Sequence, residues 1–159
     1  MIISSIKSEY LRYKNLAERA IEQTPEKELY KLFGEDNNSI SVIVSHISGN
    51  LKSRFTDFLT SDGEKEWRKR DTEFEEKHLS KEELINIWNE GWSVLLNSLA
   101  ELNDDDLNKT VTIREKELTA AEALHRSLAH TSYHVGQIVL IARMIVGKDW
   151  KSLSIPKRK

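Results

Sequence analysis

Two histidines near the C-terminal end of the chain have the spacing of a helical metal-binding pair. His130 and His134 are four residues apart, so on a helix they differ by only about 40° around the axis and can point at one ion. Zinc, nickel and iron all accept a neutral imidazole nitrogen as a ligand. Two imidazoles alone bind such an ion weakly, and a pair at this spacing can also be an ordinary pair of core histidines.

A third histidine, His46, lies on the same side of its predicted helix as Ile43 and Ile47. A ring that projects from this side into a helical core could meet the other two histidines. The three residues therefore predict one divalent transition-metal ion per chain, zinc or nickel in first place and iron as a further option. Three protein ligands leave a coordination position open for water or substrate. We assign no role to His78 and His125.

Four segments with helical periodicity are predicted to position these histidines. Their apolar residues recur at three- and four-residue steps. The segments run from about Ile3 to Ile21, from Ile40 to Phe58, from Leu84 to Leu99 and from Ala120 to Val146. Four helices of this length favour an all-α fold, a four-helix bundle, in a single domain spanning residues 1–159.

Capping signals support three of these helices. Asn38 or Ser39 can cap the second helix, and Ser80–Glu83 and Thr119–Glu122 each have the pattern of a capping box. Gly147 is a plausible stop for the last helix.

Two long connections, Glu64–Leu79 and Leu102–Leu118, permit crossover topology in place of a simple up-and-down order. The first is highly charged, and we expect its Trp67 and Phe74 to pack it against the protein. Within the second connection, Thr110–Glu117 is predicted to form a short extended piece or a turn.

The composition narrows the classes of function. A net charge of −2, with acidic and basic residues interleaved, gives no sign of affinity for nucleic acid or for a membrane. Pro156–Lys159 is a short basic tail, which we expect to be solvated. Cysteine is absent, so the chain has no thiolate ligand or sulfur nucleophile of its own. With no signal peptide or membrane span in view, we expect a soluble cytoplasmic protein.

The segment His130–Ile138 resembles the H-x3-H-x-G-Q motif of the DinB/YfiT-like superfamily, and Gly136 and Gln137 are the G and Q of this motif. His46 matches that superfamily's remaining histidine. The resemblance implies a four-helix bundle with one metal ligand on helix 2 and two on helix 4, and it implies a homodimer. Characterised members include metal-dependent transferases that use a low-molecular-weight thiol such as bacillithiol or mycothiol.

The leading hypothesis is therefore a metal-dependent S-transferase that activates an external thiol for attack on an electrophilic small molecule. Asn50 and Arg54 follow His46 at four-residue steps and are candidates for the pocket wall, although Arg54 could equally be a snorkelling surface residue. Gln137 could orient a ligand or metal-bound water, or it could form a buried hydrogen bond to a neighbouring helix.

Two other classes stay open. A metal-dependent hydrolase would use the same ion to activate water, but Thr131 follows His130, so the H-E-x-x-H spacing of many metalloproteases is missing. The second is a non-catalytic bundle, with or without metal, that serves as a stress-response binding module or as a dimeric scaffold. The segment Phe55–Asp71 looks like a subfamily signature of unassigned function.

Overall fold

The structure is a computed structural model that describes residues 1–155 and is mainly helical. Its long helices are α1 (Ile2–Gln23), α2 (Ile40–Phe55), α3 (Lys81–Glu101) and α4 (Ala120–Val146). A two-stranded antiparallel sheet, β1 (Thr110–Ile113) and β2 (Lys116–Thr119), precedes α4. The four predicted helices and the extended piece are therefore confirmed, while the basic tail Pro156–Lys159 lies outside the described residues.

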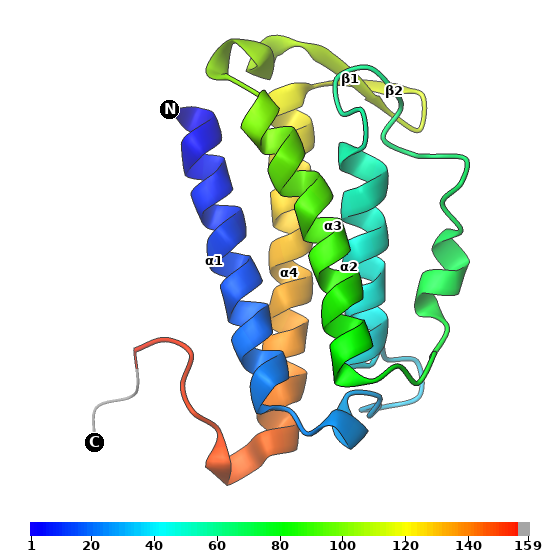
Figure 1. Ribbon diagram of the computed structural model, residues 1–159, viewed down its shortest axis with the longest axis vertical. Coiled ribbons are helices and arrows are strands. Elements are labelled where there is room, and N and C mark those ends of the chain that lie inside the picture. The colour runs from blue at the N-terminus through cyan, green and yellow to red at the C-terminus, as the bar shows by residue number, and fades with distance from the viewer. Residues whose placement is uncertain (156–159) are drawn as a thin grey trace.

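The four helices lie side by side, with α1 and α4 running in one direction and α2 and α3 in the other (Figure 1). Helix α2 packs against α3 and α4, and α1 packs against α4. Because α2 and α3 are parallel, residues 56–80 must return along the length of the molecule, as expected for a crossover connection. Residues 102–119 instead join neighbouring ends of α3 and α4 through the β hairpin, so crossover topology is wrong for this connection.

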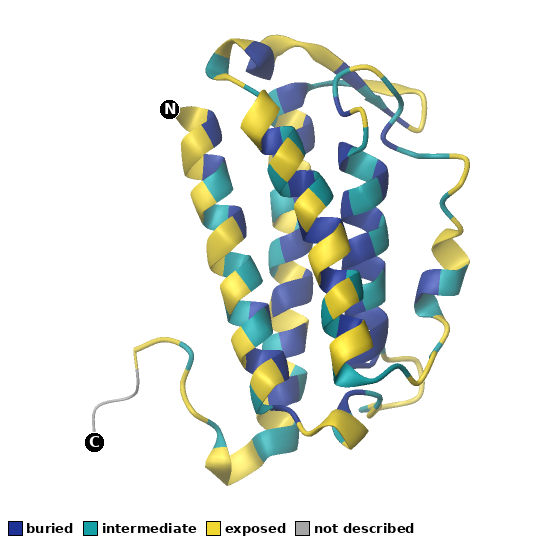
Figure 2. Cartoon of the chain, viewed as in Figure 1, coloured by how far each residue is buried: buried dark blue, intermediate teal, exposed yellow. Residues whose placement is uncertain are grey.

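Each long helix turns its apolar face inward, and exposed residues lie on the outer faces (Figure 2). Tyr10, Trp88 and Trp92 are fully buried, and the rings of Tyr10 and Trp92 meet edge to face at 6.1 Å. Helices α2 and α3 approach closely at Gly91, where a Cβ atom would lie 2.6 Å from Cα of Ser48. This contact fixes the helix that carries His46 against the core.

The capping predictions hold at four helix ends, the starts of α2, α3 and α4 and the C-terminal end of α4. The Ser39 hydroxyl, not Asn38, accepts a hydrogen bond from the backbone N–H of Val42 at 3.1 Å. Both capping boxes, Ser80–Glu83 and Thr119–Glu122, are present at the starts of α3 and α4. Gly147 follows α4 with a φ of 63°, a conformation that glycine adopts without strain.

Helix α2 ends at Phe55, so its predicted extension to Phe58 is wrong. Thr56 leaves the helical conformation, and Asp57 then takes a positive φ of 50°. Phe58 nevertheless stays buried and packs on Phe55 with ring centroids 5.2 Å apart. Phe58 therefore keeps its place in the apolar pattern of the sequence, although the helical backbone has ended at Phe55.

The Glu64–Leu79 part of the connection between α2 and α3 is packed against the protein by one of its two aromatic residues. It contains a short 3-10 helix, η2 (Arg70–Phe74). Phe74 packs against the His46 ring at 4.8 Å between centroids. Trp67 is 54% exposed, so the expectation that it packs the connection is wrong.

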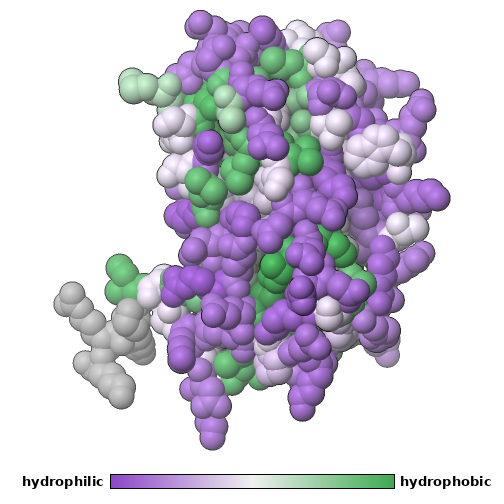
Figure 3. Space-filling view, in the orientation of Figure 1, coloured by the Kyte–Doolittle hydropathy of each residue, from purple (hydrophilic) through white to green (hydrophobic). Residues whose placement is uncertain are grey.

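The face of the molecule in Figure 3 is mostly hydrophilic, with apolar patches between the charged side chains. Within residues 1–155, none of the helices combines the length and the hydropathy that a membrane span requires.

Candidate metal centre

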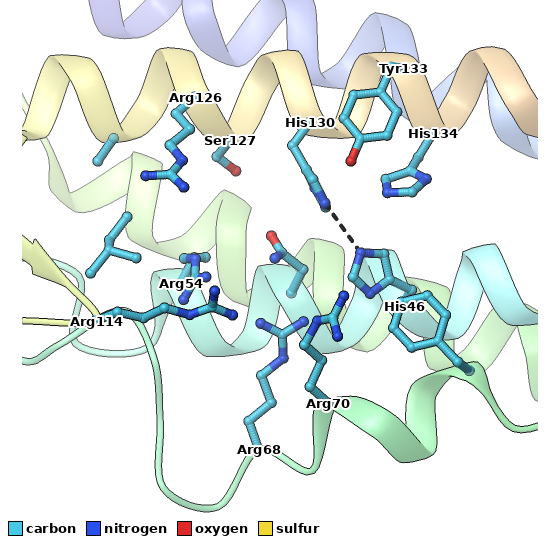
Figure 4. Close-up of a pocket in the computed structure, with 14 residues that line it drawn as sticks. His46, Arg54, Arg68, Arg70, Arg114, Arg126, Ser127, His130, Tyr133 and His134 are labelled. Atoms are coloured by element: carbon cyan, nitrogen blue, oxygen red, sulfur yellow. Dashed lines mark hydrogen bonds between the residues drawn. The ribbon is translucent and has the colours of Figure 1, made fainter. Parts of the chain in front are cut away.

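The structure brings His46, His130 and His134 together between α2 and α4 (Figure 4). Nε2 of His46 lies 3.2 Å from Nε2 of His130. One nitrogen from each ring falls within 4.8 Å of the others. His46 and His134 are buried and His130 is half-buried. Three rings from two remote parts of the chain therefore face one point.

A buried carboxylate orients the His46 ring. Glu73 Oε2 lies 2.9 Å from Nδ1 of His46, and because Glu73 is an acceptor, this nitrogen donates. Arg68 in turn donates to both carboxylate oxygens of Glu73, at 2.8 and 2.9 Å. These contacts hold the pKa of Glu73 below its usual value, although burial opposes them. With Nδ1 occupied, the lone pair of His46 is on Nε2, the atom that faces the other histidines.

Gln137 orients the ring of His134, which lies on the same helix, α4. Its Oε1 accepts a hydrogen bond from Nδ1 of His134 at 2.8 Å, so the remaining ring nitrogen of His134 carries the lone pair. Gln137 itself is exposed. Of the two roles considered for Gln137, the buried hydrogen bond to a neighbouring helix is therefore wrong, because its amide contacts a histidine ring of its own helix.

The His130 ring is held neutral by its surroundings. Burial lowers its pKa from the usual 6.5 to about 3, with smaller contributions from the neighbouring His134 and His46. Burial likewise lowers the pKa of His134. Neutral imidazole is the form that binds a metal ion, so at neutral pH these rings need no deprotonation before binding.

The arrangement fits a tetrahedral ion. Metal–nitrogen bonds of about 2.0–2.1 Å with tetrahedral angles put two ligand nitrogens about 3.3 Å apart, close to the 3.2 Å between His46 and His130. The other nitrogen pairs must close by about 1.5 Å at most from their 4.8 Å limit. Three imidazoles, two of them fixed by hydrogen bonds, could hold a divalent transition metal.

A cavity of about 570 Å³ opens beside the three histidines, a volume typical of small-molecule sites. Asn50 and Arg54 line it, as expected from their spacing after His46. Arg54 is not a free surface residue, since it donates to the Gly63 carbonyl and lies 3.3 Å from Glu64. Tyr133 lines the cavity next to His130, with ring centroids 5.2 Å apart.

Several residues of the site were missed by sequence reasoning. Glu73 and Arg68 lie in the charged connection, where charged side chains are normally solvated. The lining residues Arg70, Arg114 and Arg126 were not singled out either. Phe74, next to Glu73, was the one sequence signal that this stretch packs on the protein, and its ring lies against His46.

The remaining histidines lie apart from the site. His125 is exposed on α4, and His78 is exposed in the connection with its ring on Tyr30.

The sequence matches, over residues 1–159, the family described as "Protein of unknown function (DUF1572)". Among curated proteins, none matches the chain.

Proposed function

Since the chain belongs to the DUF1572 family over its whole length, a family without an assigned activity, we propose a function from the site itself. The protein binds one divalent transition metal through His46, His130 and His134 and uses it as a metal-dependent S-transferase. The observation that carries the metal site is the convergence of three imidazoles whose free nitrogens face one another inside the protein.

The proposed fold is the four-helix bundle of the DinB/YfiT-like superfamily. Its support is the placement of one histidine on α2 and two on α4, together with the H-x3-H-x-G-Q segment in the middle of α4. Zinc or nickel is the proposed ion, because a site of three imidazoles suits either, and iron is a further option.

A bound divalent ion would supply thiolate stabilisation at neutral pH through its open coordination position. The sulfur of the external thiol would attack an electrophilic carbon, with the C–S bond forming as the bond to a leaving group such as chloride breaks and the thiol proton passing to water. Glu73 and Gln137 would keep the histidine rings in place, and Asn50 would face the bound substrates.

The carboxylates beside the cavity favour this chemistry over hydrolysis. A hydrolase needs a general base that can take a proton from water. Glu73 is engaged by His46 and Arg68, and Glu64 by three arginines. Within the described part of the chain, the residues that line the cavity include no aspartate or glutamate.

The test is metal-dependent conjugation by the full-length protein, purified without an affinity tag and loaded with zinc or nickel. Bacillithiol, cysteine and glutathione would be offered with a chlorinated electrophile, and the conjugate would be measured by mass spectrometry. We expect turnover by the wild type and by His125→Ala, which changes an exposed histidine of α4, and none by His130→Ala. Absence of turnover in metal-loaded wild type across the panel would refute the transferase and favour a non-catalytic scaffold.

The homodimer and the cytoplasmic location stay predictions. A stripe of exposed residues on α4, Tyr133, Leu140 and Met144, would be the face for a second copy. Multi-angle light scattering on the purified protein measures the oligomeric state directly.

A further inference from the structure

The cavity beside the histidines is lined by an unusual number of arginines from separate parts of the chain. They come from α2, from the connection between α2 and α3, from the hairpin turn and from α4. The five residues are Arg54, Arg68, Arg70, Arg114 and Arg126. Figure 4 shows their guanidinium groups directed toward the cavity, with Arg54, Arg114 and Arg126 at the end away from the histidines.

Carboxylates neutralise this cluster only in part. Glu64 lies 2.8 Å from Arg114, 3.3 Å from Arg54 and 3.6 Å from Arg68, so one negative charge is shared among three cations. The second carboxylate, Glu73, is bound by Arg68. Asp71 pairs with Arg70 at 3.7 Å, but its side chain is fully exposed. Within residues 1–155, Arg126 makes no ion pair.

An excess of positive charge therefore remains in the cavity even when these three acids are counted. Burial lowers the pKa of Arg54, and the nearby Arg68 and Arg114 lower it further, although Glu64 opposes them. Like charges gathered in a concave, partly buried site attract an anion more strongly than the same charges spread over a surface. The whole chain carries a net charge of −2, so this excess is local to the cavity.

The segment Phe55–Asp71 builds much of this arginine wall. It contributes Arg68, Arg70 and the shared carboxylate of Glu64. Its Asp62 accepts hydrogen bonds from the backbone N–H groups of Arg114 at 2.9 Å and Glu115 at 2.8 Å. Both of those turn residues have positive φ angles, and Asp62 holds the turn so that Arg114 reaches Glu64. The signature segment thus has a structural role in the cavity.

We propose that the arginine cluster binds a dianionic oxygen group of the ligand, either two carboxylates or one phosphate, while the rest of the ligand extends to the three histidines. The planar forks of the arginines match the geometry of carboxylate and phosphate oxygens. This inference deepens the proposed function, since it assigns the substrate of the transferase to a doubly charged class.

The helices give the length of such a ligand. Arg126 lies four residues before His130 on α4, a rise of about 6 Å. Arg54 lies eight residues after His46 on α2, a rise of about 12 Å. Because α2 and α4 are antiparallel (Figure 1), both arginines lie toward the same end of the cavity. The dianionic group is thus about 6–12 Å from the metal site, which is the size of a small metabolite rather than of a polymer.

Isothermal titration of the full-length protein, as purified and after chelation of metal, tests this site without any catalytic assay. The probes are inorganic phosphate, malate and, as a singly charged control, acetate. We expect phosphate or malate to bind at least tenfold more tightly than acetate in both preparations, and the affinity to fall with added salt. Preference between phosphate and malate identifies the dianionic group.

Two matched variants on α4 locate the binding. Arg126→Gln removes an exposed arginine that lines the cavity, and Arg143→Gln removes an exposed arginine of the same helix that does not. Loss of one charge-assisted contact should weaken dianion binding about tenfold or more in Arg126→Gln. Arg143→Gln should bind as the wild type does, and melting curves check that both variants fold.

Equal binding of acetate and the dianions, or equal effects of the two substitutions, would overturn the inference. The outcome is separable from that of the transferase. Dianion binding without conjugation would leave the arginine site standing and remove the proposed activity. Conjugation of thiol and electrophile that are both uncharged, without dianion binding, would do the reverse.

Discussion

Gly49 allows a sharp test of how Glu73 supports the metal site. A Cβ atom at this position would lie 2.2 Å from Oε1 and 2.6 Å from Cδ of Glu73, inside any normal contact. Gly49→Ala therefore forces the carboxylate to move by about 1 Å. Glu73 is held by His46 at 2.9 Å and twice by Arg68, so a shift of that size breaks or lengthens those bonds beyond hydrogen-bonding distance.

The expected effects follow from those lost contacts. Loss of the carboxylate that orients a histidine ligand lowers metal affinity about 10- to 100-fold. Hydrogen bonds to charged groups contribute about 1.5–3 kcal/mol each, and the better helix propensity of alanine returns about 1 kcal/mol. We therefore expect the free energy of unfolding of the metal-free protein to fall by about 0.5–2 kcal/mol if one of the three bonds is lost, and by about 3.5–8 kcal/mol if all three are lost.

Competition with a fluorescent zinc chelator would measure the affinity, and urea unfolding followed by circular dichroism would measure the stability. Gly136→Ala is the matched control, because a Cβ atom there meets nothing within 4 Å. This control should keep the wild-type affinity and gain about 0.5–1 kcal/mol from helix propensity. Wild-type affinity and stability in Gly49→Ala would refute the idea that Glu73 holds His46 in place.

Two further perturbations test the packing and the titration of the site. Gly91→Ala places a Cβ atom 2.6 Å from Cα of Ser48, so urea unfolding should show a loss of about 1–3 kcal/mol, and equal stability would mean that α2 and α3 do not approach this closely. The pKa of His130 is about 3 in the folded protein, whereas in the unfolded chain its pKa is near 6.5. The stability that neutral His130 contributes to the metal-free protein is therefore fully present above pH 6.5 and is lost as the pH falls toward 3, because the unfolded state binds more protons in that window. Urea midpoints across this pH range should fall less steeply in His130→Gln, and identical slopes would contradict the neutral buried ring.

Much of the helical framework was predictable from local chemistry. Capping boxes such as Ser80–Glu83 are satisfied within one turn of chain, so their outcome does not depend on the rest of the protein. The spacing of His130 and His134 likewise fixes their relative direction once the segment is helical. The end of α2 could not be predicted from the apolar pattern, because Phe58 is buried like a helical core residue but lies in a turn after the helix.

The residues that hold the histidines and line the cavity could not be predicted, for a different physical reason. Arg68 and Glu73 lie in a charged connection, and most charged residues in such stretches are solvated. Glu73 contacts His46, and Arg68 contacts Glu73, although both lie more than twenty residues after His46 in the sequence. Arg114 lines the cavity from a hairpin turn whose backbone N–H groups bond to Asp62. Tertiary contacts of this kind leave no periodicity in the sequence.

Metal content tests the central claim most directly. Wild-type protein purified without an affinity tag would be analysed by inductively coupled plasma mass spectrometry, beside His46→Ala and the exposed-site control His125→Ala. We predict one zinc or nickel ion per chain in the wild type and the control, and a large loss of metal in His46→Ala. A wild type that carries no transition metal and takes up none when zinc is added would contradict the account.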